Sequence, residues 1–108
     1  MGNIKQAEFY IKMSVFEAVL FLEEQTVLGL PSVYYKLKTE DKIAAIITFE
    51  KYFYRTKSKA GLVITIDNFH ENTRVIAHTM AGANFLTSLG AEAAYLKKFK
   101  SLFIDKTI

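Results

Sequence analysis

The sequence contains no cysteine and only one proline among its 108 residues. Without cysteine the chain has no disulfides, no thiolate nucleophile and no cysteine-based metal site. The opening MGNIKQ lacks a basic region followed by an apolar stretch, and it lacks the Ser or Thr that an N-myristoylation signal requires. The longest uncharged apolar runs, such as residues 43–49, are far shorter than the roughly 20 residues that cross a bilayer. We therefore expect a soluble cytoplasmic protein that does not enter a membrane.

The excess of positive over negative charge is also small. Fourteen Lys and Arg residues oppose eleven Asp and Glu residues, which leaves a net charge of +3. Dedicated nucleic-acid binders carry a larger and more segregated excess, so this balance disfavours that class. With 51% hydrophobic and 23% charged residues, the composition is that of a globular chain. The length predicts a single domain over residues 1–108.

Residue periodicity predicts the elements of the fold. Apolar and polar residues alternate over residues 7–13, which indicates a half-buried strand. Ser14 and Glu17 have the spacing of a capping box, so a helix is expected to begin there and to end by Gly29 and Pro31. Further strands are predicted over residues 33–38, 43–54, 59–67 and 73–80, and a terminal amphipathic helix over residues 95–103. The order β-α-β-β-β-β-α predicts an α+β two-layer sandwich, with an antiparallel sheet of about five strands and two helices on one face.

Loop lengths predict which strand residues share a face. A tip over residues 55–58 pairs Tyr54 with Lys59, and a loop over residues 68–72 pairs Asp67 with Thr73. One face then collects the following apolar residues: Ile47, Phe49, Phe53, Leu62, Ile64, Ile66, Ile76 and Met80. This face is expected to lie beneath the helices.

Two polar residues, Lys51 and His78, fall on that same predicted face. Burying a lysine without a partner is costly. One explanation is a ligand pocket between sheet and helices, for a small apolar or anionic ligand, lined by Lys51, Phe53, Leu62, His78 and Met80. The other is structural: Lys51 extends its ammonium group to water at the edge of the core, and His78 bonds to a backbone carbonyl.

The opposite face of the predicted sheet mixes polar and apolar residues. It carries Ile46, Thr48, Glu50, Tyr52, Tyr54, Gly61, Val63, Thr65, Val75, Ala77 and Thr79. Such a surface suits association of two copies of the chain, so we expect a homodimer.

The hairpin sequence KYFYRTKSK combines aromatic rings with cations. Because aromatic rings stack on bases and cations hold phosphates, it offers an alternative function in binding nucleic acid or another anionic surface. The residues of this alternative are Tyr52, Tyr54, Arg55, Lys57 and Lys59.

No arrangement of residues indicates catalysis or a metal site. His70, Glu71 and His78 lack the spacing of metal ligands, and no serine lies in a nucleophile motif. Residues 80–92 lack the glycine spacing of a nucleotide loop and are expected to form a connection, with Gly90 near the start of the last helix. We expect no cofactor and favour a non-catalytic binding or structural role over an enzyme.

Two stretches, FEKYFYRTKSKAGLVITI and LGAEAAYLKKF, carry a resemblance that covers most of the chain. Together they are similar to a small family of uncharacterised bacterial proteins of about this length. The resemblance implies an aromatic-Arg hairpin followed by a glycine-richer loop and a helix that starts at Gly-Ala-Glu. It implies no activity, because the family has none established.

Overall fold

The computed structural model describes residues 6–54, 58–81 and 85–108. Within these ranges it describes all side chains except those of residues 30, 32–35, 53, 58, 81 and 85–92.

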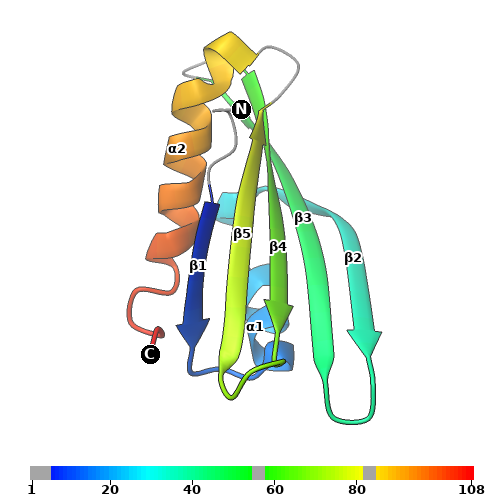
Figure 1. The fold of residues 1–108 in the computed structure, drawn as a ribbon. Helices are drawn as coiled ribbons and strands as arrows, with labels where there is room; N and C mark the ends of the chain where they lie inside the picture. Colours follow the sequence, from blue (N-terminus) through cyan, green and yellow to red (C-terminus); the bar gives the residue numbers. More distant parts are fainter. Residues whose placement is uncertain (1–5, 55–57, 82–84) are drawn as a thin grey trace.

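The elements follow the order predicted from the sequence. They are β1 (Gln6–Ile11), α1 (Val15–Glu23), a 3-10 helix η1 (Thr26–Leu28), β2 (Leu30–Lys38), β3 (Ile43–Phe53), β4 (Ser58–Asp67), β5 (Thr73–Ala81) and α2 (Phe85–Ser101). The five strands form one antiparallel sheet in the order β1-β5-β4-β3-β2. Figure 1 shows α1 behind this sheet and α2 alongside β1. The predicted α+β sandwich is therefore confirmed.

The first helix begins where the sequence predicted. The Ser14 hydroxyl accepts a hydrogen bond from the Glu17 amide at 3.1 Å, and the Glu17 carboxylate accepts one from the Ser14 amide at 2.9 Å. This capping box satisfies two amides that the first turn of a helix leaves without partners. Gly29 ends η1 with φ of 95°. A Cβ at this position would lie 2.3 Å from the Glu50 carbonyl oxygen, so the glycine allows η1 to approach β3 closely.

The pairing of β3 with β4 places residues on the faces that the sequence predicted. Lys59 lies opposite Tyr52 instead of Tyr54, so the register differs by two residues. A shift of two preserves the face of every side chain. Odd residues of β3 and even residues of β4 therefore face the helices, as Ile47 and Ile64 do with no exposed surface.

The predicted pairing of β4 with β5 was wrong by one residue. Asp67 lies opposite Arg74 instead of Thr73. A shift of one residue moves every side chain of the strand to the other face. Val75, Ala77 and Thr79 consequently face the helices and are fully buried, whereas the even residues Ile76, His78 and Met80 lie on the outer face.

The last helix starts earlier than the sequence predicted. It begins at Phe85, so Gly90 lies inside α2 and is not near its start. The helix packs against β4 and β5 through Tyr95 and Phe99, which are buried, and Phe103 adds a third buried ring just beyond it. These aromatic anchors fix the helix even though its first half contains residues of lower helix propensity.

The core lies between the sheet and both helices. Its buried members are Ile11, Val15, Ala18, Val19, Leu22, Leu28, Ala45, Ile47, Phe49, Ala60, Leu62, Ile64, Ile66, Val75, Ala77, Tyr95, Phe99 and Phe103. Among the described residues, no helix has both the length and the apolar character needed to cross a membrane.

Candidate functional site

A hollow of about 490 Å³ lies between β1 and the C-terminal part of α2. Figure 1 shows these two elements side by side along one margin of the sheet. The hollow is lined by Ala7, Glu8 and Phe9 of β1, by Lys97, Lys100 and Ser101 of α2, and by Ile104 and Thr107 beyond the helix. We call this hollow the β1–α2 groove.

The apolar side of the groove is held rigidly. The Phe9 ring packs against Phe99 at 6.1 Å and against Phe103 at 5.6 Å between ring centroids. Both partners are fully buried, so the half-buried Phe9 ring is fixed from behind. Ile104 is 79% exposed and adds a large apolar side chain at the rim. An apolar group of a ligand would be covered here without rearrangement of the core.

The helical side of the groove is basic. Lys97 and Lys100 also line a second hollow of about 280 Å³, together with Ala93 and Leu96. Residues 93, 97 and 100 follow at helical spacing, so the groove continues along one face of α2. Among the described residues, neither Lys97 nor Lys100 forms an ion pair. Their ammonium groups are available to an anionic ligand.

The last residues of the chain pair with the lower part of β1. Ile11 and Thr107 form an antiparallel bridge. The Lys12 amide donates to the Lys106 carbonyl at 2.9 Å, and the Ile108 amide donates to the Tyr10 carbonyl at 3.0 Å. One end of the groove is thus closed by an extended segment of the protein itself.

The predicted pocket residues do not come together. Leu62 is buried in the core, and the Lys51 ammonium group donates to the Val27 carbonyl at 2.8 Å. His78 and Met80 lie on the outer face because of the register of β4 and β5, so their predicted positions beneath the helices were wrong. The Phe53 side chain lies outside the described part of the structure.

The residues of the predicted anionic-surface site lie only partly within the described chain. The rings of Tyr52 and Tyr54 are in edge contact, with centroids 5.0 Å apart, and are 44% and 84% exposed. Lys59 is exposed opposite Tyr52. Arg55 and Lys57 lie outside the described residues. The hairpin therefore presents two accessible rings and at least one cation.

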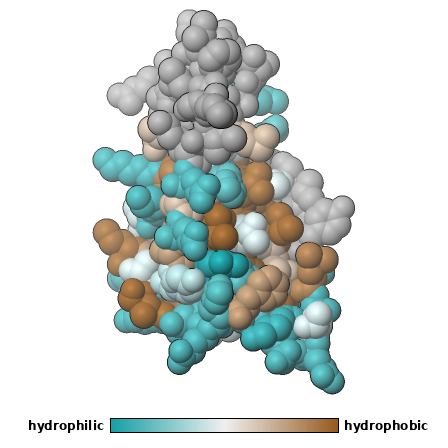
Figure 2. All heavy atoms as spheres, viewed as in Figure 1, coloured by the Kyte–Doolittle hydropathy of each residue, from teal (hydrophilic) through white to brown (hydrophobic). Residues whose placement is uncertain are grey.

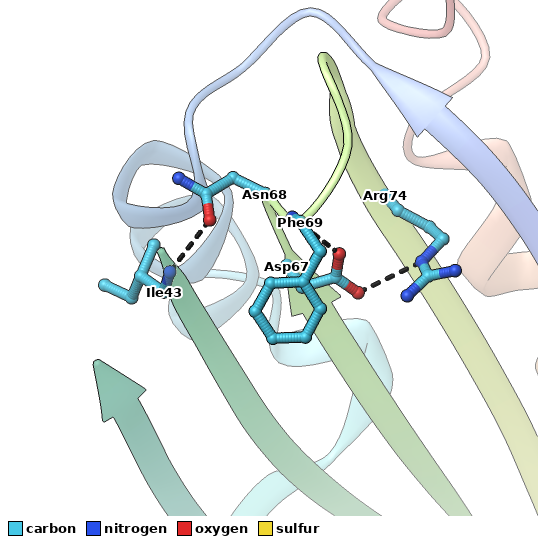
Figure 3. A network of polar contacts seen from close by, with 5 residues as sticks. All are labelled: Ile43, Asp67, Asn68, Phe69 and Arg74. Atoms are coloured by element: carbon cyan, nitrogen blue, oxygen red, sulfur yellow. Dashed lines mark hydrogen bonds and ion pairs between the residues drawn. The ribbon is translucent and has the colours of Figure 1, made fainter. Parts of the chain in front are cut away.

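A second polar cluster closes the turn between β4 and β5 (Figure 3). The Asp67 carboxylate accepts hydrogen bonds from Arg74 Nε and from the Phe69 amide, each at 3.1 Å. The Asn68 side chain accepts one from the Ile43 amide at 2.8 Å. The contact with Asp67 raises the pKa of Arg74. All of these groups bind backbone or each other, so the cluster fixes the turn.

The outer face of the sheet mixes residue types, as Figure 2 shows. Met80 is 53% exposed and Ile76 is half-buried, while the polar Thr65 and His78 lie between such residues. The homodimer expected through this face stays a prediction. Among the described residues, no group of three or more His, Asp or Glu could hold a metal ion.

A comparison with protein families adds one finding to this geometry. A family of unknown function, DUF6054, matches residues 6–106. The chain belongs to the DUF6054 family. This match confirms the resemblance to a family of unknown function that the sequence indicated. No curated protein and no solved structure significantly matches this DUF6054 chain.

In this member of the DUF6054 family, sequence patterns did not identify the groove residues as a site. The spacing of the terminal helix predicts Lys97 and Lys100 on its solvent-exposed face, and the alternation over residues 7–13 predicts Glu8 on the polar face of the first strand. Glu8 and Lys97 are 89 residues apart in the chain, so no local sequence pattern connects them. The signal that could have indicated the site is the cluster of Lys97, Lys98 and Lys100 on the last helix, with no acidic residue between them.

Proposed function

We propose that this protein is a non-catalytic binding module whose site is the β1–α2 groove. Its ligand combines apolar surface with negative charge. The observation that carries the proposal is the position of Lys97 and Lys100 beside the apolar wall of Phe9 and Ile104. The volume of about 490 Å³ falls within the range of roughly 300–1,000 Å³ typical of ligand sites.

The groove supports a binding role more directly than the interior near Lys51. There the lysine bonds to Val27 and the surrounding side chains of Phe49 and Leu62 are almost fully buried. A ligand at that position would have to displace packed core, which costs several kcal/mol by the usual measure of ~25 cal/mol per Å². The groove needs no such displacement because it is already open.

Sodium decanoate is a suitable probe because it joins an alkyl chain to a carboxylate. We expect it to bind more tightly than decanol, which shares the chain without the charge. The variants Lys97→Gln and Lys100→Gln should each weaken decanoate binding about twofold to fivefold, the range for exposed ion pairs. Lys98→Gln is the matched control, because this exposed lysine on the same helix does not line the groove. Equal binding by all three variants would refute the proposal, and melting temperatures confirm that each variant is folded.

A second candidate function concerns the hairpin end of the sheet. The exposed, touching rings of Tyr52 and Tyr54 beside Lys59 favour stacking on single-stranded nucleic acid. Glu50 is exposed on the same face and reduces the local positive charge. Fluorescence anisotropy with a labelled decathymidylate tests this candidate. Affinity that falls steeply with salt and is lost in Tyr54→Ala would support it, whereas affinity unchanged by Tyr54→Ala would exclude it.

We also propose that the protein acts in the cytoplasm as a homodimer. The absence of cysteine supports a reducing compartment. The exposed Met80 and Tyr52 on the outer face support association of two copies. Light scattering at high protein concentration checks the oligomeric state, and a monomer there would remove the dimer from the account.

A further inference from the structure

We infer that the ligand of the β1–α2 groove is an extended polypeptide segment that adds a strand to β1. This inference rests on the function proposed for the groove and names the class of its ligand. The sheet order places β1 at one margin, with β5 as its neighbour. Among the described residues, no strand covers the other side of residues 6–9.

The contacts of the chain end show which backbone groups of β1 point outward. The Tyr10 carbonyl and the Lys12 amide both bond to the C-terminal residues, on the side opposite β5. Backbone groups alternate in direction along a strand, so residues with the same parity point the same way. Glu8 therefore directs its amide and carbonyl outward, and Glu8 also lines the groove.

The chain's own last residues show that this side of β1 accepts a strand. Thr107 already forms a bridge with Ile11 in antiparallel orientation. An incoming segment would occupy the same side of the strand farther along, opposite residues 6–8. Each outward-facing residue there supplies one donor and one acceptor. Addition of a strand to an exposed edge is a recurrent mode of peptide recognition.

The opposite margin of the sheet is less suited to a partner strand. There β2 contains Pro31, which has no amide hydrogen, and an irregularity between Pro31 and Val33. Lys36 and Lys38 are exposed on the same strand. Proline, bulges and lysine are features that prevent pairing at sheet edges. Binding is thus directed to β1.

The walls of the groove define the side chains that the segment should carry. Successive side chains of a strand alternate in direction, so every second one would point toward α2. Of these, apolar side chains would contact Phe9 and Ile104, and an acidic one would reach Lys97 or Lys100. We therefore expect a segment in which apolar and acidic residues occupy alternate positions with small polar residues between them.

The peptide acetyl-Thr-Val-Thr-Glu-Thr-Val-amide has this pattern and serves as the probe. A fluorescein in place of the acetyl group reports binding through anisotropy. Two further peptides carry N-methyl groups, one on the threonine amides and the other on the valine and glutamate amides. Because only one set of amides can face β1, one methylated peptide should lose at least about tenfold in affinity, and the other should bind as the parent does.

The protein offers a matched test at Glu8. Glu8→Pro removes an amide that points away from β5 and therefore leaves the sheet intact, whereas Glu8→Thr removes the charge and keeps the amide. Peptide binding should weaken at least about fivefold in Glu8→Pro relative to Glu8→Thr. In the wild-type protein, hydrogen exchange at the Glu8 amide should slow at least about tenfold when the peptide binds.

The outcomes separate this inference from the proposed function. If decanoate binds the groove while the parent peptide does not bind, or both methylated peptides behave alike, strand addition is wrong and the groove remains a ligand site. If neither decanoate nor the peptide depends on Lys97 and Lys100, the proposed function fails as well. Melting temperatures of Glu8→Pro and Glu8→Thr must agree, and hydrogen exchange at Glu8 decides the question if Glu8→Pro does not fold.

Discussion

The phenol of Tyr95 donates a hydrogen bond to the carbonyl of Leu28, which ties α2 to the 3-10 helix that ends 67 residues earlier. The Lys51 ammonium group donates to the adjacent Val27 carbonyl. The last carbonyls of a helix lack intrahelical partners, and here two side chains from other elements supply them. Lys51 on the face of the sheet beneath the helices is thereby explained by a structural bond.

Replacing Tyr95 by phenylalanine should destabilise the protein. Tyr95 is 1% exposed, so the change leaves a buried carbonyl without this donor, and we expect the free energy of unfolding to fall by about 1–3 kcal/mol. Urea denaturation measures the loss. Tyr54→Phe is the control, because Tyr54 is 84% exposed, and it should change stability by less than about 0.5 kcal/mol. Equal stability of the two variants would contradict this assignment.

Alkaline pH should weaken the fold through the same phenol. Burial, and to a lesser extent Glu50, raise the pKa of Tyr95 above its ordinary value of 10.0. An unfolded chain then releases this proton at lower pH than the folded chain. The contribution of Tyr95 is constant below about pH 10 and is lost as pH rises above it. Between about pH 9 and about pH 11, the free energy of unfolding measured by urea denaturation should fall less steeply with pH in Tyr95→Phe than in wild type.

The ion pair of Asp67 and Arg74 should stabilise the turn between β4 and β5 (Figure 3). The Asp67 side chain is 2% exposed and that of Arg74 is 23% exposed. Arg74→Ala leaves the buried Asp67 carboxylate with fewer donors and should lower the free energy of unfolding. The pair of Asp105 and Lys106 is the control, because the Asp105 side chain is 78% exposed. Asp105→Ala should lower the free energy of unfolding much less than Arg74→Ala does. If both variants lowered the free energy of unfolding by similar amounts, the ion pair of Asp67 and Arg74 would not stabilise the turn more than an exposed pair does.

This cluster also explains the error in the predicted register. Loop length alone paired Asp67 with Thr73, whereas the actual pairing with Arg74 depends on the bonds of Asp67 to Phe69 and Arg74. The apolar pattern did not correct the error, because Ile76 and Met80 looked at least as suitable for the core as Val75 and Ala77. Both faces of β5 mix apolar and polar residues, so tertiary contacts select which face is buried.

Other parts of the fold were predictable because their signals are local. The capping box of Ser14 and Glu17 defined the start of α1, and alternation defined the strands. The start of α2, in contrast, has no such local signal in the sequence. Burial of Tyr95 and Phe99 compensates for Gly90 within the helix. The β1–α2 groove was unpredictable for a related reason, since it joins the first strand to the last helix.

Gly29 should tolerate no side chain. Its φ of 95° and ψ of −160° belong to a region that essentially only glycine adopts, and a Cβ would lie 2.3 Å from the Glu50 carbonyl oxygen. We expect Gly29→Ala to lower the free energy of unfolding by about 2–4 kcal/mol. Gly61→Ala is the control, because the nearest atoms to its Cβ lie 3.8 Å away. Thermal unfolding in which both variants match wild type would contradict this account.

The central claim is that the β1–α2 groove binds a ligand combining apolar surface with negative charge. The most direct measurement is a titration of the ¹⁵N-labelled protein with sodium decanoate, followed by amide chemical shifts. The account predicts saturable shifts at residues 7–9 and 97–101. Lys97→Gln and Lys100→Gln should weaken this response, and the control Lys98→Gln should leave it unchanged. Shifts confined to residues around Lys51 or Tyr52, or no saturable shifts at all, would contradict it.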